Sequence, residues 1–146
     1  MRELLGEMDA DIGRLYAARG VTGVRPRFSM ALIRLHHRGP MTVKELAEQI
    51  DVSHSAMSQT VTAMRSEGLV ETAPGRDART RDVRLTEKGR ALVPFLEAEW
   101  RATERAFAEL ETELPYALTQ VVEDMAAALR RRPFLDRITA ALDEGP

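Results

Sequence analysis

The 146-residue chain contains no cysteine. It can therefore form no disulfide framework, and it has neither a thiolate nucleophile nor a thiol to sense oxidation. Common enzyme motifs are missing too, because the sequence has no GxSxG, no glycine-rich phosphate loop and no paired His and Glu motif. We expect a protein that is not an enzyme and that uses no cofactor.

Histidine is scarce, and so are long apolar runs. The only histidines are His36, His37 and His54, and no carboxylate or imidazole recurs around them at metal-ligand spacing, so we predict no metal site. No apolar run approaches 18 residues, and the N-terminal MRELLGEMDADIGRLY is acidic and amphipathic, unlike a signal peptide. We expect a soluble, cytoplasmic protein with no membrane partner.

The net charge of −2 is unevenly distributed. Residues 25–90 hold 12 Lys and Arg against 8 Asp and Glu, whereas the rest of the chain holds 9 against 15. A positive middle section suits contact with phosphates, although ordinary surface asymmetry can produce a similar excess. The length corresponds to one domain.

The most informative stretch runs from Ser53 to Gly68, with the sequence SHSAMSQTVTAMRSEG. Ser53 is a good N-cap and Gly68 is placed to end a helix. Met57, Val61 and Met64 form one apolar stripe, and the opposite side carries short neutral polar residues, namely Ser55, Ser58, Gln59 and Thr62. Such donors and acceptors suit base edges in the major groove of DNA, and the alternative is a polar surface helix that never meets DNA.

The segments before and after this helix carry sequence signals that are typical of one DNA-binding fold. Upstream, residues 42–50 form a short capped helix that breaks at Asp51 and Val52, which gives a helix-turn-helix. Downstream, two strands are predicted over 69–72 and 82–85, joined by the loop PGRDARTR. This loop carries Arg76, Arg79 and Arg81, so the whole unit is predicted to be a winged helix-turn-helix.

Two runs, LAEQIDVSHSAMSQTVTAMRSEGLVE and GRDARTRDVRLTEKGRAL, resemble the MarR family of bacterial transcriptional regulators. One departure is Asp51, which stands where such turns usually have a left-handed Gly, and Asp tolerates that conformation. The family's wing motif falls on Asp77 and Arg79. We predict that Arg79 reaches the minor groove while Asp77 orients a wing arginine. The predicted DNA contacts are Ser53, His54, Ser55, Ser58, Gln59, Thr62, Arg76, Arg79 and Arg81.

Amphipathic helices are predicted on both sides of this module. They cover residues 2–18, about 27–38, a long segment after the N-cap Thr86 with Pro94 inside it, a segment that Pro115 opens as its first residue, and 133–142. The fold class is mainly α, with about six helices and a two- to three-stranded β-wing.

The terminal helices carry more apolar residues than a small winged helix can cover, so we predict a homodimer that binds a pseudo-palindromic operator. The chain is then a single MarR-like domain, 1–146. In it, residues 25–90 form the DNA-binding module, and 1–24 with 91–146 supply the dimerisation helices.

His36 follows Phe28 and Leu32 on one side of its helix, so its ring is expected to point inward. It is either a satisfied structural histidine or, as the resemblance implies, part of an effector cavity. With Arg27 nearby, the predicted pocket of Arg27, Phe28, Leu32 and His36 would take a small aromatic or anionic effector. The resemblance implies a repressor that such a ligand releases from DNA. The alternative is a protein-binding adaptor or anti-regulator that keeps the fold without binding an operator.

Overall fold

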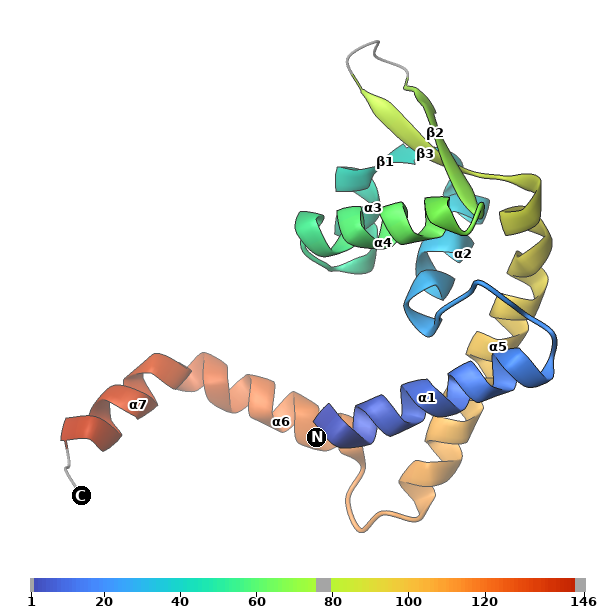
Figure 1. The fold of residues 1–146 in the computed structure, drawn as a ribbon. Coiled ribbons are helices and arrows are strands. Elements are labelled where there is room, and N and C mark those ends of the chain that lie inside the picture. Colours follow the sequence, from blue (N-terminus) through green and yellow to red (C-terminus); the bar gives the residue numbers. More distant parts are fainter. Residues whose placement is uncertain (1, 76–79, 144–146) are drawn as a thin grey trace. The chain divides into compact units, whose positions relative to one another are not determined.

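The computed structural model describes residues 2–75 and 80–143, and the chain divides into two compact units, Met1–Trp100 and Arg101–Pro146. The described residues form seven α-helices, one 3-10 helix and a three-stranded sheet, which confirms the mainly helical winged-helix fold (Figure 1). The elements are α1 (Arg2–Ala18), η1 (Pro26–Phe28), α2 (Ser29–Arg38), β1 (Met41–Thr42), α3 (Val43–Ile50), α4 (His54–Ser66), β2 (Val70–Pro74), β3 (Arg81–Leu85), α5 (Glu87–Thr112), α6 (Leu118–Arg131) and α7 (Phe134–Asp143).

The helix-turn-helix consists of α3 and α4. Thr42 caps α3 in a capping box, because its hydroxyl accepts a hydrogen bond from Glu45 N–H while the Glu45 carboxylate accepts one from Thr42 N–H. Asp51 ends α3 in the left-handed conformation, with φ 58° and ψ 48°, as the sequence predicted. The chain therefore turns sharply before Ser53, which caps α4.

The sheet is antiparallel in the order β1-β3-β2. Its main part is the β2–β3 hairpin, in which Val70 pairs with Leu85, Thr72 with Val83 and Pro74 with Arg81. The strand β2 begins one residue later than predicted and ends two residues later, and β3 begins one residue earlier than predicted.

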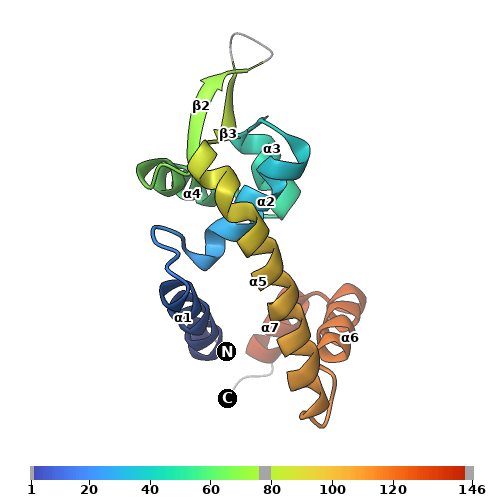
Figure 2. The same ribbon diagram turned by 90° about the vertical axis from the view of Figure 1, so that its right-hand side faces the viewer.

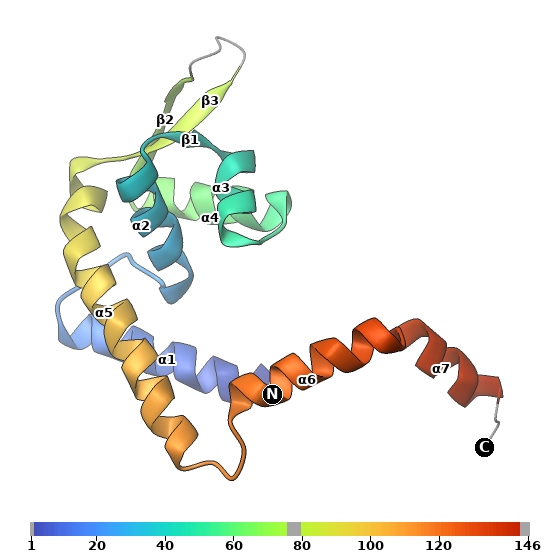
Figure 3. The same cartoon turned by 180° about the vertical axis from the view of Figure 1, so that it is seen from behind.

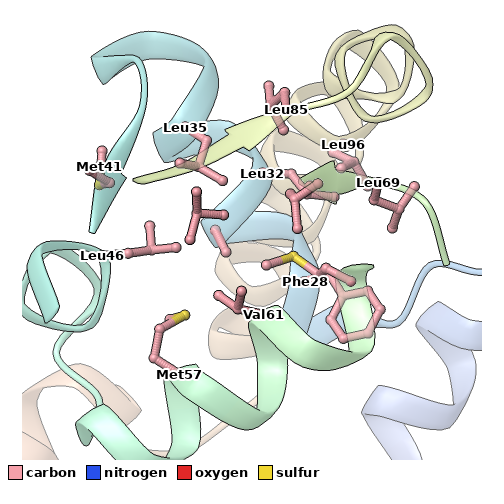
Figure 4. Close-up of a cluster of buried hydrophobic side chains, with 14 of the residues drawn as sticks. Phe28, Leu32, Leu35, Met41, Leu46, Met57, Val61, Leu69, Leu85 and Leu96 are labelled. Atoms are coloured by element: carbon pink, nitrogen blue, oxygen red, sulfur yellow. The ribbon is translucent and has the colours of Figure 1, made fainter. Parts of the chain in front are cut away.

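The core of the first unit lies between the helix-turn-helix, α2, the sheet and the first turns of α5. In two opposite views α2 lies between the α3–α4 pair and the first turns of α5 (Figures 1 and 3). In Figure 2, which is seen from the side of α5, α5 passes in front of α2. Figure 4 shows Met57 and Val61 of α4 directed into a cluster with Leu32 and Leu46, all of them buried. Burying these side chains stabilises the unit by about 1.5 to 3 kcal/mol each.

The start of α5 is fixed against the turn that follows α4. Thr86 is the predicted N-cap: its hydroxyl accepts a hydrogen bond from Gly89 N–H at 3.1 Å and donates to the Gly68 carbonyl at 2.7 Å. Pro94 lies inside α5, which continues through it. Because proline has no N–H, the carbonyl one turn earlier loses its helical partner there.

In the second unit, α6 begins at Leu118, so the prediction that Pro115 is its first residue is wrong. The reason is that the helix is capped from a distance: Glu111 of α5 accepts hydrogen bonds from Thr119 N–H at 3.0 Å and from its hydroxyl at 3.2 Å. A carboxylate at this end also complements the helix dipole.

None of the described residues from 101 to 143 is buried. Large apolar side chains of this segment are instead exposed in the single chain, among them Phe107, Leu110, Tyr116, Leu118, Val121, Val122, Met125, Leu129, Phe134 and Leu135.

Candidate nucleic-acid interface

The helix α4 has the two faces that its sequence predicts. Met57, Val61 and Met64 are buried, and Met64 is fully so. The predicted base-reading residues Ser55, Ser58, Gln59 and Thr62 are all exposed. The buried stripe fixes the rotation of the helix about its axis, so the neutral polar face must point outward from the unit.

The polar side chains on this face are not equally available to a ligand. The Ser53 hydroxyl accepts a hydrogen bond from Ala56 N–H at 3.2 Å, which is its capping function. The Thr62 hydroxyl donates to the Ser58 carbonyl at 2.9 Å, so its proton is used within the helix. The Gln59 amide makes no hydrogen bond to any residue within the described ranges and keeps its full donor and acceptor capacity.

The wing is only partly described. Arg76, Asp77 and Arg79 lie outside the described residues, so their predicted roles stay predictions. Arg81 begins β3 and is exposed, and its guanidinium lies 3.4 Å from both the carbonyl and the hydroxyl oxygen of Thr72. On the other face of the hairpin, Arg84 donates to Glu71 at 2.8 Å.

The residues predicted to line an effector pocket do not share one environment. Phe28 and Leu32 are fully buried in the core, whereas Arg27 is exposed with its guanidinium 5.6 Å from the centre of the Phe28 ring. The prediction that His36 points inward is wrong, because it is exposed and contacts His37 edge-to-face. At 100° per residue, His36 falls within the angular range of the buried stripe of α2, but it lies in the last turn of the helix, where the residues that follow Leu35 are exposed.

A buried polar cluster was not predicted from the sequence. The Tyr16 hydroxyl of α1 lies 2.9 Å from the Ser29 hydroxyl of α2 and donates to the Glu99 carboxylate of α5 at 3.1 Å. Glu99 is only 6% exposed. Burial raises the pKa of Tyr16 to about 12; the Ser29 hydrogen bond opposes this rise, and the negative charge of Glu99 adds to it. The one sequence signal for the cluster is an acid one turn after the buried Leu96.

Over residues 2–75 and 80–143, no group of three His, Cys, Asp or Glu side chains is arranged to hold a metal ion. Over the same ranges, no helix has the length and apolar character needed to span a membrane.

The fold and the outward polar face of α4 define a winged helix-turn-helix protein. Residues 22–80 match the sequence model described as the MarR family. The predicted resemblance to MarR-family transcriptional regulators is thereby confirmed for this segment of the chain. A comparison with curated proteins returns no match.

Solved structures agree with this resemblance. A MarR family transcriptional regulator from Silicibacter pomeroyi is 28% identical, with 86% of this chain and 90% of the other covered and a TM-score of 0.53. The Mycobacterium tuberculosis regulator MOSR, solved in complex with DNA, is 26% identical over 97% and 93%, with a TM-score of 0.59. The Staphylococcus aureus MepR–DNA complex, at 17% identity over 89% and 90% and a TM-score of 0.63, shares the fold.

Proposed function

We propose that this protein is a sequence-specific DNA-binding regulator whose helix α4 lies in the major groove. The observation that carries the proposal is the neutral polar face of α4, which is exposed while the opposite stripe of methionine and valine is buried. Amide and hydroxyl groups can bond to base edges, and the unpaired Gln59 amide suits a bidentate contact with adenine. The structure of MOSR, which is 26% identical to this chain, was solved in complex with DNA, and this supports DNA binding by the present protein.

The wing supplies the second part of the proposed interface. Arg76 and Arg79 belong to the loop sequence that connects β2 to β3, and Arg81 is the first residue of β3. We propose that Arg79 enters the minor groove, whose negative potential is strongest in narrow A·T tracts, and that Asp77 holds a wing arginine in place.

The protein is proposed to act as a homodimer. The amphipathic helices α6 and α7 have no buried residue in the single chain, and exposed apolar faces of this size usually mark interfaces. In this arrangement residues 1–24 and 91–146 join the subunits, and residues 25–90 bind DNA. A two-fold dimer places two α4 helices in successive major grooves, so the operator is pseudo-palindromic.

We further propose repression that a small aromatic or anionic effector relieves. Such a ligand must bind more tightly to a dimer whose α4 helices are wrongly spaced for the operator. Of the four residues first assigned to its pocket, Arg27 and His36 are accessible. A thermal-shift screen of phenolic and small lipophilic acids tests this part.

The proposed DNA binding is tested by titrating the protein into a labelled duplex from the region upstream of its own gene. The proposal requires nanomolar binding that weakens as salt rises, because phosphate contacts release counterions. No binding at low salt would favour the adaptor alternative, in which the fold recognises another protein.

A further inference from the structure

A groove of about 560 Å³ lies between the end of α4 and the β2–β3 hairpin. Its lining includes Thr62, Arg65 and Ser66 from α4, Val70 and Thr72 from β2, and Arg81 from β3. We call it the α4–hairpin groove. It adjoins the proposed base-reading face, because Thr62 belongs to both.

Two arginines line this groove from different elements. Arg65 is exposed in the last turn of α4. Alternation along β3 puts Arg81 on the same side of the strand as the buried Val83 and Leu85, and therefore on the side that faces the core helices. Both guanidinium groups thus border the groove.

The charges near the groove leave these arginines available to an anion. Glu71 is the acidic residue of the lining, and it is already paired with Arg84 at 2.8 Å. Arg65 forms no ion pair with any residue in the described part of the chain. The contacts of Arg81 with Thr72 are long, at 3.4 Å, and occupy one nitrogen of its guanidinium. Arginine presents five N–H donors in a planar fork that matches phosphate oxygens.

Arg65 could also have a purely structural role at the end of α4, without binding an anion. A cation in the last turn of a helix is favourable to the helix dipole, and a solvated arginine there needs no ligand. The same dipole, however, repels an anion near the end of α4. A bound anion would therefore depend on the arginines for its stabilisation, so removing one arginine should have a measurable effect on binding.

We propose that the α4–hairpin groove holds one backbone phosphate of a DNA duplex between Arg65 and Arg81. This inference rests on the proposed function and adds a positioning residue, Arg65, to the predicted contacts. A phosphate fixed at this point sets how the neighbouring face of α4 meets the bases, while itself carrying no sequence information.

The test is a salt titration of full-length wild-type and Arg65→Ala protein on two duplexes, one enriched by the wild-type protein from a random pool and one of random sequence. The variant should bind both duplexes more weakly. Its slope of log affinity against log salt should shrink by about one unit per subunit, or about two for a dimer. Its ranking of mutated duplexes should remain that of the wild type. Arg65→Lys should keep most of the slope because it keeps the charge.

Arg38→Ala is the matched control, because Arg38 also lies in the last turn of a helix and does not line the groove. It should leave the slope unchanged. A double variant of Arg65 and Arg81 should lose less affinity than the two single losses multiplied together, since both residues hold the same phosphate. Melting temperatures of all variants should match, which separates binding from folding.

Three results would overturn the inference. If the wild type binds DNA and Arg65→Ala keeps its slope, the groove holds no phosphate, and the proposed function stands without it. If Arg38→Ala reduces the slope equally, the slope reports the total positive charge of the protein and not a phosphate bound in the groove. If the wild type binds neither duplex, the proposed function fails and the inference fails with it.

Discussion

At the residue scale, the buried hydroxyl of Tyr16 joins three helices. Its hydrogen bonds to Ser29 and Glu99 connect α1, α2 and α5 within the first unit. A buried polar group needs such partners, because an unsatisfied one costs about 1 to 3 kcal/mol. The cluster therefore fixes where the end of α1 meets α2 and α5.

Tyr16 should make stability depend on pH in the alkaline range. Its pKa is raised from 10.0 to about 12 in the folded protein, so the folded state keeps a proton that the unfolded chain releases. The resulting stabilisation is fully present below pH 10 and is lost as the pH rises to about 12. Over that range the wild type should lose roughly 2 kcal/mol more unfolding free energy than Tyr16→Phe does.

Urea unfolding at several pH values measures this difference. Tyr116→Phe, at a position that is 76% exposed, is the matched control and should follow the wild-type profile. Parallel curves for the wild type and Tyr16→Phe would show that the Tyr16 proton is not linked to folding.

The sequence predicted those residue roles that depend on near neighbours. Helical spacing was enough to assign the buried stripe of α4. The helix caps Thr42 and Thr86 were also predictable, because each threonine hydroxyl accepts a hydrogen bond from the backbone N–H only three residues later. It did not predict the bond between Tyr16 and Glu99, which are 83 residues apart. His36 was misplaced because helical spacing gives the side of a helix and not how far along its axis the core extends, and His36 lies in the last turn of α2.

At the element scale, α5 starts against the backbone of the turn after α4. A Cβ atom added at Gly89 would collide with the Leu69 carbonyl oxygen, which is fixed backbone and already accepts a hydrogen bond from Thr86 N–H at 3.1 Å. Glycine is thus required here by a close approach of two elements.

Gly89→Ala should therefore destabilise the protein by about 1 to 3 kcal/mol, as overpacking does, although alanine favours helix formation. Gly13→Ala in α1 is the control, because nothing lies within 4 Å of its added Cβ. That change should stabilise by up to about 1 kcal/mol. Equal effects of the two substitutions on thermal unfolding would contradict the close approach.

Helix boundaries were predicted well where the capping residue is close in sequence, and poorly where the cap comes from another helix. The helix-turn-helix was located by the capped start of α3 and the break at Asp51. The start of α6 was placed three residues early, because its cap comes from Glu111 of another helix and the proline at 115 gave a misleading local signal.

At the scale of the whole molecule, the proposed function requires a second copy of the chain. On α6, Leu118, Val121, Val122, Met125 and Leu129 form a single stripe that is exposed in the single chain. Covering about 1,000 Å² or more is typical of a stable dimer. The sequence could predict this unpartnered stripe but not the geometry of the partner.

A charge placed in this stripe should break the dimer. Val122→Lys should shift the protein toward monomer in sedimentation experiments and weaken operator binding, because a lysine would be buried without a partner. Gln120→Lys adds the same side chain on the opposite side of α6, next to Asp124, and should leave the dimer intact. A full-length wild type that sediments as a monomer at micromolar concentration would refute the dimer.

The central claim is that the exposed face of α4 recognises base edges, and selection from a random pool of duplexes tests it most directly. Wild-type protein should enrich a pseudo-palindromic sequence. Gln59→Ala should enrich the same sequence with the preference lost at one base pair per half-site, at a cost of about 1 to 3 kcal/mol on the wild-type site. Enrichment of no sequence by the wild type, or of an unchanged sequence by Gln59→Ala, would contradict the account.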